Sequence, residues 1–62
     1  MPSTRNALKK LLDVTERQIA QAEARLMKAA SDEERTRLVD TLTDLHVAQA
    51  EIADALTEGG QA

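Results

Sequence analysis

The sequence predicts an all-α fold, an antiparallel two-helix hairpin that dimerises into a four-helix bundle. Two stretches of the chain carry apolar residues at alternating spacings of four and three, a pattern that only a helix presents on one face. These two apolar stripes are out of phase with each other. With 62 residues, the chain is also too short to bury a large core alone, so we expect one domain, residues 1–62, that is stabilised by assembly.

The first helix is expected over about residues 4–29. Its stripe is a heptad seam in which large residues at position a alternate with mostly small residues at position d, where a neighbouring backbone can approach closely. The residues of this seam are Leu8, Leu12, Thr15, Ile19, Ala22, Leu26 and Ala29. Pro2, Ser3 and Thr4 precede the seam and offer a proline and hydroxyl caps for the start of the helix.

A turn is expected at about residues 30–32. One continuous rod is excluded because the d positions jump from Ala29 to Leu38, nine residues where a heptad allows seven. At about 100° per residue, the two extra residues rotate the stripe by roughly 200°. Ser31 and Glu34 fit a capping box at this break, in which the serine accepts from an amide of the first turn and the glutamate reaches back to the cap.

The second helix is expected over about residues 32–58, followed by a flexible tail at residues 59–62 that begins with Gly59 and Gly60. Its stripe consists of Leu38, Leu42, Leu45, Gln49, Ile52 and Leu56. Apolar residues also flank this stripe, so its face is broader than a two-stranded coiled coil needs. We therefore expect the residues of both stripes to form an oligomer interface.

Composition and charge both favour association. Of the 26 apolar residues, 11 are alanine and none is aromatic, which leaves a thin core for an isolated hairpin. Residues 1–30 carry six basic and three acidic side chains, whereas residues 31–62 carry two and eight. This asymmetry favours pairing of one helix with the other, although an exposed ion pair contributes only about 0.2–1 kcal/mol. We expect the partners to be a second copy of the chain, in a homodimer, and another protein.

A polar layer is expected halfway along the hairpin, where residues of both helices lie level with each other. Its members are Thr15, Gln18, His46 and Gln49. A buried polar residue in a helical seam can fix the register and the oligomeric state of the assembly, at some cost in stability. We therefore interpret this layer as the device that selects the register of association.

No catalytic, cofactor or metal site is expected, and we predict that the chain is not an enzyme. His46 has no second histidine or acidic residue at helical spacing before it, so we interpret it as structural or exposed, with a pH sensor as the alternative. The chain contains no cysteine, no glycine-rich loop and no Ser-His-Asp arrangement. A charged residue interrupts every apolar stretch well before about 18 residues, so neither a signal peptide nor a membrane span is expected, and the predicted location is cytoplasmic.

Two surface features could bind a partner. Arg5, Lys9 and Lys10, with Arg17 further along, form a basic cluster that could contact nucleic acid, although a net charge of −3 and the absence of aromatic residues favour a solvated helix face. Two outward-facing valines could begin a docking patch, the alternative being ordinary exposed apolar residues. These valines are Val14 and Val47.

The chain resembles the Rop family, small plasmid proteins that fold as helical hairpins. The resemblance lies in length, in alternating large and small core residues, and in a mid-chain turn followed by a leucine-bearing helix with two acids and a histidine. The residues that carry it are Ser31, Asp32 and Glu33 at the turn, and Asp40, Asp44 and His46 in the helix.

This resemblance implies a dimeric four-helix bundle that modulates the pairing of two RNA loops and so regulates plasmid copy number. In that family, RNA is held by basic and polar residues of the first helix around an exposed phenylalanine, and Val14 stands at the corresponding place here. The residues that could fill the basic and polar roles are Arg5, Lys9, Gln18 and Arg25. RNA binding is therefore the alternative to our main hypothesis, a protein-binding regulator or adaptor.

Overall fold

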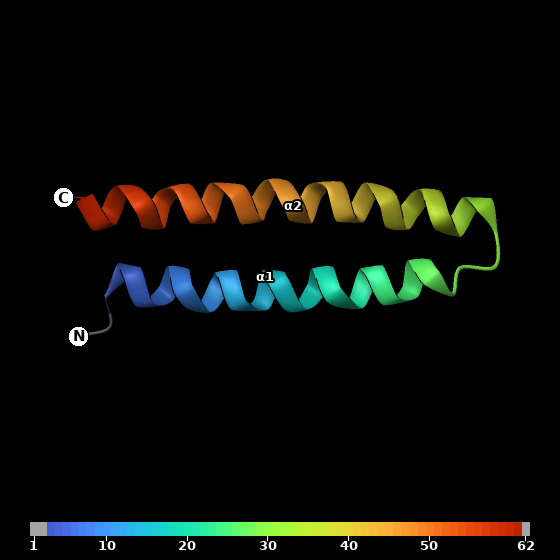
Figure 1. The fold of residues 1–62 in the computed structure, drawn as a ribbon, viewed down its shortest axis with the longest axis horizontal. Helices are drawn as coiled ribbons and strands as arrows, with labels where there is room; N and C mark the ends of the chain where they lie inside the picture. Colours follow the sequence, from blue (N-terminus) through green and yellow to red (C-terminus); the bar gives the residue numbers. More distant parts are fainter. Residues whose placement is uncertain (1–2, 62) are drawn as a thin grey trace.

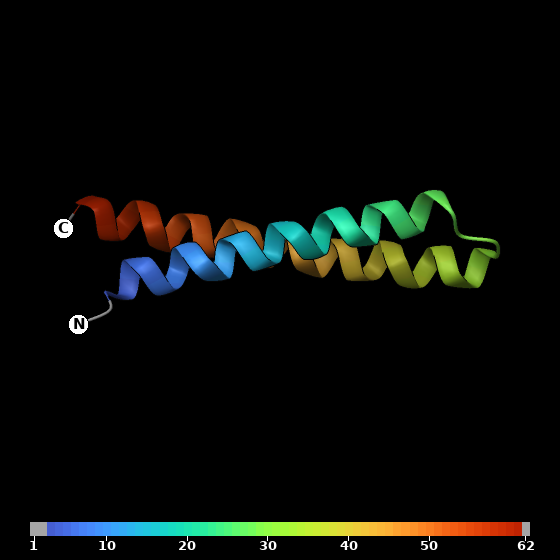
Figure 2. The same cartoon turned by 90° about the horizontal axis from the view of Figure 1, so that it is seen from below.

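The computed structural model describes the backbone of residues 3–61 and the side chains of residues 3–58, and it consists of two helices packed as an antiparallel hairpin (Figure 1). Helix α1 spans Thr4–Met27 and helix α2 spans Asp32–Gln61. The turn lies at one end of the hairpin, and both ends of the described chain lie at the other. Figure 2 shows the two helices crossing near their middles at a shallow angle, so that they wrap around each other. The predicted all-α hairpin is confirmed.

Helix α1 begins at a hydroxyl cap. The Oγ of Ser3 accepts a hydrogen bond from the backbone N–H of Asn6 at 3.1 Å, which satisfies one of the amides left free at a helix start. The carbonyl of Ser3 also accepts from the N–H of Ala7 at 3.2 Å, the first bond of the helical ladder. Pro2, which was expected to contribute to this start, lies outside the described residues.

Helix α1 ends at Met27, two residues before the predicted end. The N–H of Lys28 donates to the carbonyl of Arg25 at 3.0 Å, and the N–H of Ala29 donates to the carbonyl of Leu26 at 3.2 Å. These bonds reach back three residues and tighten the last turn, which satisfies carbonyls that the α-helix leaves free. Between residues 3 and 61 no φ angle is positive, so this connection does not require a glycine.

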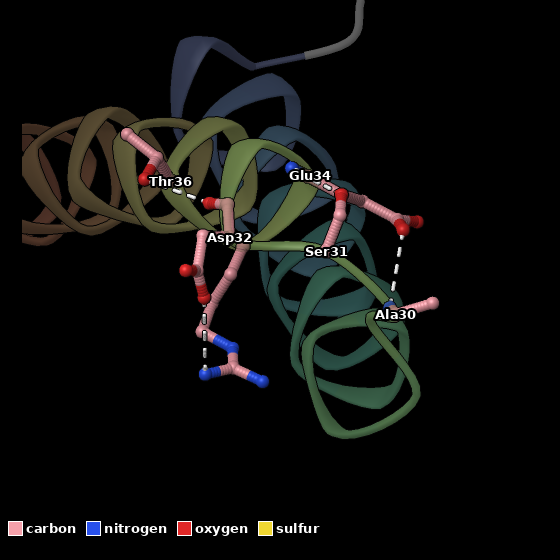
Figure 3. Close-up of polar contacts among 6 residues, drawn as sticks. Ala30, Ser31, Asp32, Glu34 and Thr36 are labelled. Carbon is pink, nitrogen blue, oxygen red and sulfur yellow. Dashed lines mark hydrogen bonds and ion pairs between the residues drawn. The ribbon is translucent and has the colours of Figure 1, made fainter.

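Helix α2 begins at the predicted cap, with one difference (Figure 3). The N–H of Glu34 donates to the Oγ of Ser31 at 3.2 Å, as in a capping box. The Oε2 of Glu34 accepts instead from the N–H of Ala30, one residue before the cap, at 3.4 Å. Three acidic residues in the first turn then lie at the positive end of the helix dipole, an arrangement that stabilises the start of α2.

The C-terminal end of α2 differs from the prediction. The helix continues through Gly59 and Gly60 to Gln61, where a tail was expected after residue 58. Glycine in a helix costs about 1 kcal/mol relative to alanine, but it keeps the backbone donor and acceptor that the ladder needs. None of the described glycines has a positive φ, so the helix does not end in a left-handed glycine cap there. Ala62, the last residue of the predicted tail, lies outside the described residues.

The core follows the two predicted stripes. Its buried members are Thr15, Ile19 and Ala22 of α1 and Leu42 and Ile52 of α2. The other stripe residues are half-buried: Leu8, Leu12, Leu26, Ala29, Leu38, Leu45, Gln49 and Leu56. Around Ile19, Ala22 and Leu42, the side chains of Leu26 and Leu45 complete the central cluster. Neither helix, over the residues described, contains a stretch that is long and apolar enough to cross a membrane.

Candidate association surface

The seam leaves two flanking faces on the hairpin. In an antiparallel helix pair, the residues at heptad position g of both helices border one side of the seam, and those at position e border the other. The g face, as we call it, consists of Thr4, Leu11, Gln18 and Arg25 of α1 and Glu34, Thr41, Ala48 and Ala55 of α2. The e face consists of Lys9, Glu16 and Glu23 of α1 and Asp32, Val39, His46 and Ala53 of α2.

The side chains on the g face confirm that its two halves lie together. A shallow hollow at the open end of the hairpin is lined by Thr4, Arg5, Leu8, Ala55 and Leu56. Thr4 and Ala55 are both at position g, and Leu8 and Leu56 are the last apolar layer of the seam. Ala48 and Ala55 are half-buried, whereas the corresponding e-face residues of α2 are exposed. The small side chains of the g face therefore sit close to the seam.

Two large apolar side chains remain exposed at the edge of this face. Leu11, at position g of α1, is 51% exposed, and Val14, at the neighbouring position c, is 46% exposed. Because residues three apart are neighbours on a helix surface, Leu11 and Val14 form one continuous apolar area beside the seam. Single exposed apolar side chains are ordinary on a protein surface, but these two adjoin each other and the half-buried seam.

The second residue of the predicted valine patch lies elsewhere. Val47 is 52% exposed, but it occupies position f of α2, the back of that helix. Val14 instead borders the g face, so the two valines point away from the seam in different directions. Binding of a partner by Val14 and Val47 together stays a prediction, and the exposed apolar residue adjacent to Val14 is Leu11, three residues earlier in the same helix.

The predicted polar layer is only half enclosed by the hairpin. Thr15 is buried, with 4% of its surface exposed, and Gln49 is half-buried. Gln18 and His46 are exposed, and they lie on opposite flanks of the seam, on the g face and the e face respectively. The Oγ1 of Thr15 donates to the carbonyl of Leu11 in its own helix at 2.8 Å. A single hairpin therefore does not bring the four side chains into one layer.

The predicted basic cluster points in several directions. Arg5, Lys9 and Lys10 are all exposed, but they occupy positions a, e and f of α1, so only Arg5 lines the hollow of the seam. Arg17 forms an ion pair with Asp13 one turn before it, at 3.1 Å, and both side chains are largely exposed. Such a pair contributes about 0.3–0.5 kcal/mol to the helix and draws the arginine toward an acid rather than toward the cluster.

No protein-family model, no curated protein and no solved structure matches this chain. Among the described residues, no three His, Asp or Glu side chains gather where they could hold a metal ion. The surface offers apolar side chains in contact with water, small side chains beside them, and two helices of opposite net charge. These are properties of a surface that can bind another amphipathic helix.

Proposed function

We propose that this chain is a non-enzymatic protein-binding module, a regulator or adaptor that works as a homodimeric four-helix bundle. The observation that carries the proposal is the incomplete burial of the seam. Even the most enclosed side chain among residues 3–58, Thr15, keeps 4% of its surface exposed, and six seam leucines are only half-buried. The proposal includes a cytoplasmic location, with which the absence of cysteine agrees.

The energy of covering these leucines is of the right size to drive dimerisation. Full burial of a leucine contributes about 1.5–3 kcal/mol, so a leucine that is still partly exposed has at most about 1 kcal/mol to gain. Twelve such side chains in a dimer would contribute at most about 12 kcal/mol, which lies within the roughly 4–15 kcal/mol that association costs. The flanking apolar residues, Leu11 and Val14, would therefore decide whether the dimer is stable at micromolar concentration.

Sedimentation equilibrium at micromolar concentration tests the dimer. The expected mass is twice the 6.8 kDa of one chain, with helical circular dichroism at the same concentration. A helical monomer would contradict the proposal. A chain that gains helix only when mixed with a different protein would show instead that the bundle is completed by that other chain.

RNA binding is the second candidate, and the exposure of three basic side chains at the start of α1 is the observation that favours it. Arg5, Lys9 and Lys10 could contact phosphates of a structured RNA. A gel shift with a stem-loop RNA at low and high salt tests this function, and the double variant Lys9→Glu with Lys10→Glu should abolish the shift. No shift of the natural chain at low salt would exclude it.

A further inference from the structure

The e face and the g face differ in the free energy that it would cost to pack a second hairpin against them. Every e position of α1 between residues 9 and 23 is charged, by Lys9, Glu16 and Glu23. Covering charged groups without partners is expensive because they lose their hydration. On the g face, by contrast, α1 offers Leu11 and Gln18 and carries one charged residue, Arg25. The g positions of α2 are small except for one charged residue, Glu34, next to the turn. A second hairpin is therefore accommodated more readily on the g face than on the e face.

Two closed arrangements bring the g faces of two hairpins together with two-fold symmetry. A two-fold axis parallel to the helices places both turns at the same end and lays α1 of one copy against α2 of the other. A two-fold axis perpendicular to the helices and parallel to the stacked faces places the turns at opposite ends. In this arrangement α1 packs against α1 of the other copy, and α2 packs against α2. The two arrangements bury the same face, so the choice between them rests on charge and on the fit of individual side chains.

Charge favours the same-end arrangement. Helix α1 carries five basic and three acidic side chains, a net charge of +2, whereas α2 carries two basic and eight acidic side chains, a net charge of −6. In the opposite-end arrangement, the two acidic α2 helices would lie side by side and repel each other. In the same-end arrangement, each α1 lies between two α2 helices, one from each copy, and every neighbouring pair is antiparallel. Such complementarity selects between arrangements more than it adds affinity.

Side-chain size favours the same arrangement. Because both hairpins then share one level along the bundle, the g residues of α1 face the g residues of α2 in the partner. Leu11 would lie against the partner's Ala55, and Gln18 against the partner's Ala48. Large side chains against small ones allow the two layers to interdigitate. In the opposite-end arrangement, Leu11 would instead lie beside the α1 helix of the partner.

We infer that a second copy of this chain binds to the g face, with both turns at the same end of the bundle and Leu11 against the partner's Ala55. This inference rests on the proposed homodimer. It adds which face of each hairpin forms the interface and how the two hairpins are oriented. The hollow lined by Leu8, Ala55 and Leu56 adjoins this contact and would be covered in it.

Cysteine cross-linking tests the face. The chain has no cysteine of its own, so Leu11→Cys and Ala55→Cys can be prepared as separate proteins, mixed and oxidised. A disulfide between the two different variants, identified by mass spectrometry, is expected because the facing Cβ atoms would approach the roughly 3.5–4.5 Å that a disulfide needs. The matched control is Lys9→Cys mixed with Ala53→Cys, on the e face, which should not cross-link. Equal linking of both pairs, or linking of the control alone, overturns the inference.

Distance measurement between spin labels tests the topology without altering the g face. Ala30→Cys, exposed in the turn, carries the label, and the hairpin is 47 Å long. Same-end packing gives a short distance, set by one or two helix spacings of about 10 Å each. Opposite-end packing gives a distance close to the length of the hairpin. A long distance in a confirmed dimer overturns this inference alone, whereas a monomer in sedimentation overturns the proposed function with it.

Discussion

Thr15 is the most enclosed side chain among residues 3–58, and it is polar. Its hydroxyl donates to the carbonyl of Leu11, one turn earlier in the same helix, at 2.8 Å. That bond satisfies the hydroxyl without help from α2 or from a second chain, so the side chain can be enclosed at little cost. Thr15 therefore acts in the seam mainly as a small, β-branched spacer rather than as a polar contact between helices.

Thr15→Val is expected to leave the free energy of unfolding unchanged or to raise it by up to about 1 kcal/mol. The carbonyl of Leu11 keeps its place in the helical ladder, and valine adds an apolar methyl group at a buried position. Chemical denaturation measures the stability, and sedimentation at the same concentration measures the oligomeric state. If this variant instead forms a mixture of oligomeric states, the hydroxyl of Thr15 specifies assembly, as the polar-layer hypothesis holds.

The positions of Gln18 and His46 could have been predicted more fully than they were. Their levels along the hairpin follow from the turn near Ser31, which places them level with Thr15 and Gln49. Their angular positions follow from the heptad, which puts Gln18 at g and His46 at e, on opposite flanks. Whether a second hairpin covers either side chain depends on contacts between chains, and these are not determined by the pattern within one helix.

At the scale of the helices, the cap of α2 combines two side chains with two backbone amides (Figure 3). Ser31→Ala removes the acceptor for the N–H of Glu34, now at 3.2 Å, and is expected to lower the free energy of unfolding by about 1 kcal/mol. Thermal or chemical denaturation followed by circular dichroism measures this change. Thr43→Ala is the control, because its exposed hydroxyl only donates to the carbonyl of Val39, four residues earlier, and caps nothing. An equal loss in both variants would contradict a capping role for Ser31.

The helices themselves were predictable because their seams repeat, whereas their ends depend on local geometry. The phase jump between Ala29 and Leu38 required a break, and the hairpin places it there. Backbone hydrogen bonds between residues three apart end α1 at Met27. No particular residue type in the sequence indicates that such hydrogen bonds will form. At the other end, a glycine pair indicated a stop, but glycine only weakens a helix and does not forbid it, so α2 continues to Gln61.

At the scale of the whole molecule, Leu11 should contribute to association rather than to folding of the hairpin. It is 51% exposed, so Leu11→Ser forfeits about 1 kcal/mol of apolar burial in each copy of a dimer. The dissociation constant should rise roughly 10- to 100-fold, measured by sedimentation over a range of concentrations. Met27→Ser is the matched control, because Met27 is 89% exposed at position b on the other flank, and this variant should leave the dissociation constant unchanged. Equal effects would place the contact outside the g face.

Salt separates the two forces that the same-end arrangement combines. In the proposed dimer, apolar burial provides the affinity, and it does not weaken with sodium chloride. The attraction between basic α1 and acidic α2 is instead screened over about 10 Å at 0.1 M salt and about 3 Å at 1 M. Adjacent helix axes lie about 8–10 Å apart, so 1 M salt should remove most of the electrostatic preference and leave the dimer intact. Labels at Ala30→Cys should then give a single short distance at low salt and an added long component at 1 M. If the distance distribution is the same at both salt concentrations, side-chain fit between Leu11 and the partner's Ala55 selects the topology, and charge does not.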